Sequence, residues 1–168
     1  MKRFVFAFLA IAVLALGSGS ALAAPPSEET VGFVLTAASC PNLPTGTVIT
    51  GTGTSTTVEI VKTDGNGVTT VTNTTHASGT ATDQEGNTYR FNYSNHFRIS
   101  NTGPTDPVLS GVMVDSFSLA GNGPAQLNNG FRAVFTIDLL TGAASFAELS
   151  SRGDPIDFAT GEARCDPL

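Results

Sequence analysis

The sequence predicts an all-β, single-domain protein, built as an antiparallel up-and-down barrel of about eight strands, with a two-sheet β-sandwich as the alternative. Thr, Val, Phe and Ser dominate the composition, and no stretch of useful length has the period of an amphipathic helix. Apolar and polar residues instead alternate, most clearly in residues 89–100, "YRFNYSNHFRIS". Clusters of Gly, Asn, Asp and Pro separate the alternating segments, as turns do.

An export signal precedes the domain. Two basic residues are followed by an uncharged apolar run, residues 4–16, and then by the small residues of "GSGSALA". This is the pattern of a secretory signal peptide, and we expect cleavage after Ala23. The apolar run is shorter than the roughly 20 residues that span a bilayer, so the mature chain should be exported without a membrane anchor. Residues 24–29, "APPSEE", are expected to form a flexible arm before the domain, residues 30–168.

Turn signals divide the domain into consecutive hairpins. The segments "DGNG", residues 64–67, and "DQEGN", residues 83–87, supply residues that tolerate the positive φ of tight turns. Several of the intervening strands exceed the usual five or six residues, so the sheet must twist, coil or close, and a closed meander is a barrel. The expected strands are residues 30–37, 47–51, 54–62, 68–82, 88–100, 108–120, 131–140 and 143–149.

The mature chain is acidic. Cleavage after Ala23 removes two of the eight basic residues and none of the fourteen acidic ones, which leaves a net charge of −8. Such a surface repels phosphate backbones and anionic lipids, so we expect no nucleic-acid partner and no membrane binding after cleavage. Solubility outside the cell is the simplest reason for the acidity. The long Thr-rich strands leave homo-oligomerisation open.

Two cysteines, Cys40 and Cys165, lie near the two ends of the mature chain. Exported proteins meet oxidising surroundings, and an even number of cysteines favours a bridge. The bridge would close a loop of about 125 residues, for which chain entropy gives roughly 5 kcal/mol, reduced in practice by strain and residual unfolded structure. We therefore expect a structural disulfide rather than a metal or redox site.

The alternation in residues 89–100 places two arginines and a histidine on the even-numbered face and aromatic side chains on the odd-numbered face. A half-buried antiparallel strand displays alternation of this kind. Exposed Arg and His side chains are the common case, so we interpret the even-numbered face as solvated. Val112 and Val114 make the even positions of the next strand apolar as well, which leaves the identity of the interior face open.

Asn95 and Asp115 interrupt the apolar odd-numbered faces of two neighbouring strands. With the connecting hairpin centred near Pro104, Asn95 should lie opposite Met113 and diagonal to Asp115, at about 7 to 8 Å between backbones. A buried carboxylate must be hydrogen-bonded or neutral. In one interpretation Asn95, with Tyr93 or a buried water as a further donor, satisfies Asp115, and the pair fixes the strand register.

In the other interpretation Asn95 and Asp115 are the convergent polar groups of an aromatic cavity, the usual composition of a small-molecule pocket. An eight-stranded barrel is just wide enough to hold one small ligand or to fill with side chains. The ligand-binding candidates are Tyr89, Phe91, Tyr93, Asn95, Phe97, Asp115, Phe117 and Phe135, with Phe131 as a further cavity residue.

The sequence contains no G-x-S-x-G, H-E-x-x-H, P-loop or dinucleotide-binding motif, so no catalytic residue is identified by a motif, and we expect no cofactor. His76 and His96 fall on neighbouring strands, and His76 should lie opposite Ser94 if the intervening turn is centred near Glu85. The two histidines lack a third ligand. We expect two surface histidines and no metal site.

Three classes of function are consistent with these features. The first is a secreted protein that binds a small apolar or aromatic ligand in its interior. The second is an extracellular structural or protein-binding module. The third is a cofactor-free barrel enzyme of the isomerase or cyclase type, with Asp115 as acid or base and Tyr93 as its partner, which rests on analogy of fold alone.

Overall fold

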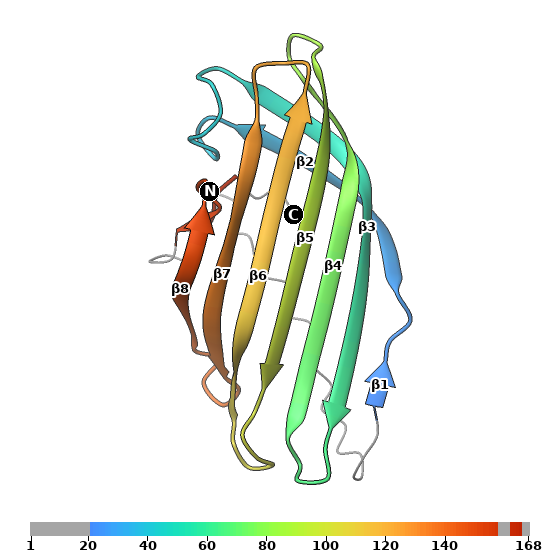
Figure 1. Ribbon diagram of the computed structural model, residues 1–168, viewed down its shortest axis with the longest axis vertical. Helices are drawn as coiled ribbons and strands as arrows, with labels where there is room; N and C mark the ends of the chain where they lie inside the picture. Colours follow the sequence, from blue (N-terminus) through green and yellow to red (C-terminus); the bar gives the residue numbers. More distant parts are fainter. Residues whose placement is uncertain (1–20, 158–161, 166–168) are drawn as a thin grey trace.

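The computed structural model describes residues 21–157 and 162–165, and the predicted signal peptide lies outside these residues except for its last three. Long strands run side by side in one curved antiparallel sheet (Figure 1). Its strands are β1 (Ala21–Ala23), β2 (Ser27–Thr36), β3 (Val48–Thr63), β4 (Thr69–Asp83), β5 (Thr88–Ser100), β6 (Val108–Gly121), β7 (Leu127–Asp138) and β8 (Ala144–Arg152). A separate short hairpin joins β9 (Ile156–Asp157) and β10 (Glu162–Ala163).

The strands β3 to β8 pair in chain order, each antiparallel to the next, as an up-and-down fold requires. β1 and β2 both pair with the other side of β3, β2 with its first part and β1 with its last. All eight strands belong to one sheet, not to the two sheets of a sandwich. Among the described residues no ladder joins β8 to β1 or β2, so the predicted closure into a barrel is not confirmed.

A disulfide links the β2–β3 loop to the C-terminal segment, two parts that no strand ladder joins among the described residues. After β8 the chain leaves the sheet as the β9–β10 hairpin, and Cys165 at its end bonds to Cys40 in the loop between β2 and β3. The N–H of Cys165 donates to the carbonyl of Ser39, and Asn129 Nδ2 of β7 donates to the carbonyl of Cys165. The predicted disulfide is confirmed, and it ties the β2–β3 loop to β7 through the C-terminal segment.

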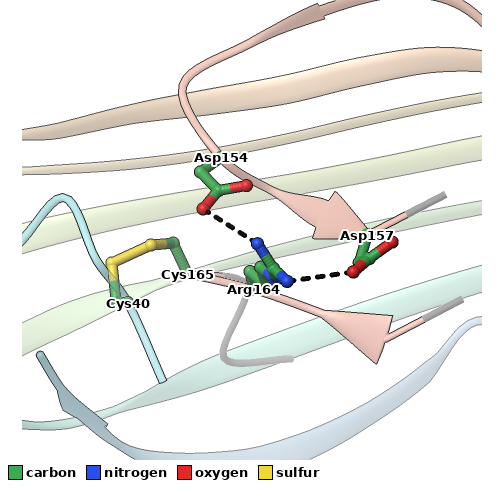
Figure 2. A network of polar contacts seen from close by, with 5 residues as sticks. All are labelled: Cys40, Asp154, Asp157, Arg164 and Cys165. Carbon is green, nitrogen blue, oxygen red and sulfur yellow. Dashed lines mark hydrogen bonds and ion pairs between the residues drawn. A yellow bond between two sulfur atoms is a disulfide. The ribbon is translucent and has the colours of Figure 1, made fainter. Parts of the chain in front are cut away.

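The C-terminal hairpin is held by Arg164 as well as by the disulfide. Its guanidinium lies 2.9 Å from Asp157 and 3.6 Å from Asp154, and Figure 2 shows the three side chains beside the Cys40–Cys165 bridge. The N–H of Arg164 also donates to the carbonyl of Pro155. These contacts give the short hairpin a fixed shape although it has no place in the main sheet.

Strand register places the odd-numbered residues of β2 to β7 on one face, which we call the inner face. One cross-strand row runs through Thr57, Thr75, Asn95, Asp115 and Phe131. The buried apolar side chains of these strands are odd-numbered, and the even-numbered outer face is more exposed and carries polar side chains together with several valines. The interior face left open by the sequence is therefore the odd-numbered one. A register shift beside Ala133 then turns Phe146 of β8 to the inner face, opposite Phe135.

Apolar side chains on the inner face form two clusters, named by their position in Figure 1. In the upper cluster the ring of Phe33 packs edge-on against Phe91 and Phe117, with ring centroids 5.0 and 6.0 Å away. The lower cluster centres on Val71, Ile99, Leu109 and Phe135, with partly buried neighbours. Those neighbours are Val61, Phe97, Met113, Ile137 and Phe146.

The strand β3 is continuous, so the prediction of two separate strands, residues 47–51 and 54–62, is wrong. The sequence "GTG" at residues 51–53 reads as a break, but its glycines are extended and lie under aromatic rings. Gly53 pairs with Gly79, and a Cβ on either residue would lie 2.7 Å from the ring of Phe91. Glycine is needed here because the ring occupies the space of a side chain.

Several other element boundaries differ from those expected, among them the starts of β2 and β7 and the end of β8, which extends to Arg152. β2 begins at Ser27, so half of the predicted N-terminal arm is paired with β3. β7 begins at Leu127, four residues before the expected strand, because "NNG" at residues 128–130 is part of the ladder and not a turn. Asn129 is buried there, where its side chain binds the C-terminal segment.

The turns after β3 and β4 are built alike. Asp64 Oδ1 accepts the N–H groups of Asn66 and Val68, and Asp83 Oδ1 accepts those of Glu85 and Asn87. A glycine with positive φ follows three residues after each aspartate. These are the hairpins predicted from "DGNG" and "DQEGN", with the aspartate side chain closing the turn.

Candidate functional site

The predicted polar group on the inner face is present. Asp115 is 4 % exposed, and its Oδ2 accepts hydrogen bonds of 2.8 Å from Tyr93 Oη and from Asn95 Nδ2. The register differs from the expected one by two residues, because the hairpin is centred at residue 105 and not at 104. Asn95 therefore lies directly opposite Asp115, and Phe97 takes the place opposite Met113.

The Asp115 group lies between the two apolar clusters. On β5 and β6 the next inner-face pair toward the upper end is Tyr93 with Phe117, and the next pair toward the lower end is Phe97 with Met113. Tyr93 thus presents its ring to the upper cluster and its hydroxyl to the carboxylate. A buried carboxylate with hydrogen-bond donors on the adjacent strand fixes the pairing of the strands, since a slip of one residue would move it to the outer face.

The structure divides the remaining ligand-binding candidates between the two clusters. Tyr89, Phe91 and Phe117 are almost fully buried in the upper cluster, where the rings of Phe91 and Phe117 pack against Phe33 and each other. Phe97 and Phe135 belong to the lower cluster, where their rings meet edge-on at 6.1 Å. The two sets lie on one face but on opposite sides of the Asp115 group. A cavity lined by all of these side chains together stays a prediction.

A second set of polar side chains on the inner face was not predicted. Thr57 pairs with Thr75 and Glu59 pairs with Asn73 across β3 and β4. The two threonine hydroxyls are 2.9 Å apart, and Thr75 also donates to Asn73 Oδ1 at 3.3 Å. We call these four residues the polar strip. It continues the row of Asn95 and Asp115 from β5 onto β4 and β3, and the apolar pair Val61 and Val71 follows it toward the lower end.

A further buried contact lies at the upper end. Tyr89 Oη donates to Asp83 Oδ2 at 2.9 Å, and Asn87 Nδ2 donates to the same oxygen at 2.8 Å. The hydrogen bond from the Asn87 side chain, with a smaller contribution from Tyr89, holds the pKa of Asp83 below its ordinary value, against an opposing effect of partial burial. Burial, and then the hydrogen bond to Asp83, raise the pKa of the Tyr89 phenol. The pair closes the β4–β5 turn over the upper cluster.

The outer face carries a shallow groove of about 570 Å³ that crosses the middle of the sheet from β3 to β8. Most of its lining side chains are hydroxyls and amides, with His76 and Arg152 among them. His76 lies opposite Ser94, as predicted, and His96 Nδ1 lies 2.9 Å from the hydroxyl of Thr74. The polar lining residues from even-numbered positions are Thr54, Thr56, His76, Ser78, Asn92, Ser94, Ser116, Ser118, Asn128 and Arg152.

In the part of the chain that the structure describes, no group of three or more His, Cys, Asp or Glu side chains has an arrangement that would hold a metal ion. No helix there is long and apolar enough to cross a bilayer.

The confirmed disulfide indicates an oxidising, extracellular environment. Comparisons of the chain with models of protein families, with curated proteins and with solved structures find no match.

Proposed function

We propose that the protein is exported and binds a small, largely apolar or aromatic ligand on the lower half of the inner face. The observation that carries this proposal is the difference between the two clusters. The aromatic side chains of the upper cluster are almost fully buried and packed against one another, whereas Phe97, Met113 and Phe146 of the lower cluster are only partly buried. The lower half is thus the part of the inner face with apolar surface left to cover.

The composition of the lower inner face suits such a ligand. Phe97, Met113 and Phe146 offer apolar and polarizable surface, and Phe135 stacks on Phe146 with centroids 6.0 Å apart. Across the same face, Glu59 and Asn73 of the polar strip present oxygen and amide groups. Ligand pockets are mostly apolar with a few polar groups that set orientation. We therefore propose a ligand with an apolar body and one hydroxyl or amine that reaches the polar strip.

Binding fits the geometry better than the proposed isomerase or cyclase activity. The enzyme interpretation assigns Asp115 the role of acid or base and Tyr93 that of its partner. Tyr93 Oη and Asn95 Nδ2 already donate to the same carboxylate oxygen at 2.8 Å. A carboxylate held by donors on its own sheet has the environment of a structural group, and the adjacent apolar surface is then a place for a ligand and not for proton transfer.

The proposal is tested by titrating the mature protein with N-phenyl-1-naphthylamine, a neutral apolar dye that fluoresces in apolar sites. The test variant is Met113→Gln, which makes the inner face polar beside Phe97. The matched control is Val114→Gln on the adjacent outer-face position, where the side chain is 44 % exposed. We expect Met113→Gln to weaken dye binding about tenfold, the loss of roughly 1.4 kcal/mol of apolar contact, and the control to leave it unchanged. Equal binding by both variants would contradict the proposal.

A further inference from the structure

The cationic side chains of the sheet are gathered on its outer face. Six of the chain's eight Lys and Arg residues lie after the predicted signal peptide, and five of those six are exposed at outer-face positions. The chain as a whole is acidic, so this face differs in sign from the rest of the molecule. The five residues are Lys62, Arg90, Arg98, Arg132 and Arg152.

Carboxylates are nearly missing from the same face. In the ladders of β2 to β8, the outer-face carboxylates are Glu28 near the start of β2 and Asp138 at the end of β7. Asp138 closes the following turn, where its Oδ1 accepts the N–H groups of Leu140 and Thr141. In the part of the chain that the structure describes, the ion pairs are those of Arg164 in the C-terminal hairpin. The outer-face cations have no carboxylate to neutralise them there.

The outer face is also hollowed, beside its positive charges. Ser94, Ser116 and Gly130 form one cross-strand row between His76 and Arg152. The small side chains of Ser94 and Ser116 line the groove of about 570 Å³, which longer side chains border. A second hollow of about 400 Å³ shares Ser116 and Arg152 with it and includes Arg132. The two hollows make a continuous strip across the strands toward the β8 edge.

We propose that the outer face binds an acidic polysaccharide. Arg side chains bind carboxylate or sulfate groups in a bidentate manner. The Ser, Thr and Asn side chains of the groove supply donors and acceptors for sugar hydroxyls along the same strip. A repeating chain of hydroxylated, negatively charged units matches a groove lined by small polar groups, with Arg132 and Arg152 at its β8 end.

The same face is poorly suited to nucleic acid. No aromatic side chain lies at an outer-face position of the described strands β2 to β8, so bases would have no ring to stack on. The net negative charge of the chain also repels a dense phosphate backbone at long range. A carbohydrate with more widely spaced charges meets the local cations with less of this repulsion. This inference concerns the face opposite the proposed small-ligand site and does not depend on it.

The test uses a galacturonate hexamer as the probe and its methyl ester, which has the same sugars without the charge, as the ligand control. Binding is measured by isothermal titration calorimetry on the disulfide-bonded protein. We expect the acid to bind and the ester not to bind. We also expect binding to weaken at least about tenfold as NaCl rises from about 50 mM to about 0.5 M, because the contacts are exposed and screened.

The test variant is the double substitution Arg132→Ser with Arg152→Ser, which should weaken binding of the hexamer at least about tenfold through the loss of two charge-assisted contacts. Arg164→Ser removes one positive charge outside the outer face and should leave the affinity unchanged. Thermal unfolding of each variant confirms that it is folded. The proposal is overturned if the hexamer does not bind, if the ester binds equally, or if a single-stranded oligodeoxynucleotide binds more tightly. Loss of binding in Arg164→Ser equal to that in the double variant also overturns it.

Discussion

Asn95 of β5 lies directly opposite Asp115 of β6, and its amide donates a 2.8 Å hydrogen bond to the buried carboxylate. This polar contact lies on the inner face between the upper and lower clusters, beside the polar strip. Tyr93 completes the group from the same strand. The arrangement fixes the β5–β6 register and also marks the boundary between the filled and the partly exposed halves of the inner face.

Removing the carboxylate should destabilise the protein. Asp115→Ala leaves the Tyr93 hydroxyl and the Asn95 amide without this acceptor inside the sheet, and we expect a loss of about 1 to 3 kcal/mol of unfolding free energy. Asp115→Asn keeps an acceptor oxygen and should cost less. Urea denaturation measures both, with Ser116→Ala on the outer face as the control. Unchanged stability in Asp115→Ala would show that the contact does not hold the strands in register.

The disulfide should contribute strongly to the free energy of unfolding, since it connects the β2–β3 loop to the C-terminal segment and no ladder does so. Replacing Cys40 and Cys165 by serine should lower the free energy of unfolding by about 2 to 5 kcal/mol. Thermal unfolding with and without reductant measures the effect. The native protein should lose stability on reduction, and the double variant should not respond. A native protein that unfolds at the same temperature in reductant would contradict this role.

Gly79 should not accept a side chain. A Cβ at this position would lie 2.2 Å from the carbonyl oxygen of Thr52 and 2.7 Å from the ring of Phe91. We expect Gly79→Ala to destabilise by about 1 to 3 kcal/mol through overpacking. The control is Gly65→Ala, because Gly65 has open space around its Cβ position and no positive φ. If the two variants unfold at the same urea concentration, the Phe91 ring does not pack as closely on Gly79 as described.

The Asp83–Tyr89 contact should make stability depend on pH at both extremes. The folded-state pKa of Asp83 is lowered, so its contribution is present above the unfolded pKa near 3.8 and is lost as pH falls through the folded value. The folded-state pKa of Tyr89 is raised, so its contribution is present below the unfolded pKa near 10 and is lost as pH rises toward the folded value.

The variants Asp83→Asn and Tyr89→Phe separate these two effects. Asp83→Asn should flatten the decrease in melting temperature below pH 4, and Tyr89→Phe should flatten the decrease above pH 10. Melting temperatures measured across both ranges check each expectation. Variants that follow the native pH profile at both ends would show that the contact does not influence stability.

Local patterns predicted much of the sheet. Alternation favoured the odd-numbered inner face of β5, although the apolar even positions of β6 left the choice open, and the tight "DQEGN" turn predicted the β4–β5 register, with His76 opposite Ser94. The β5–β6 register was misplaced by two residues because residues 101–107 form a longer loop whose centre is not marked by a single turn motif. The Asn95–Asp115 contact was still found, since diagonal and direct neighbours both lie within reach on one face.

Other features depend on contacts distant in sequence. The polar strip was not predicted because threonine occurs on both faces of β3 and β4. Odd and even positions of these strands therefore look alike in the sequence. The continuity of β3 depends on the ring of Phe91, which lies two strands away from the glycine it covers. Closure of the sheet is decided by where β8 ends and where the C-terminal segment turns, and hairpin signals carry no information about either.

The most direct measurement of the proposed function follows the methyl resonance of Met113 during a titration. The chain has two methionines, and removal of the predicted signal peptide leaves Met113 as the single one, within the lower cluster. The mature protein with ¹³C-labelled methionine methyl groups is titrated with N-phenyl-1-naphthylamine and observed by NMR. Binding on the lower inner face predicts a large shift of this resonance from the dye's ring current, saturating together with the fluorescence. A fluorescence signal that saturates while the Met113 resonance stays in place would contradict the proposed site.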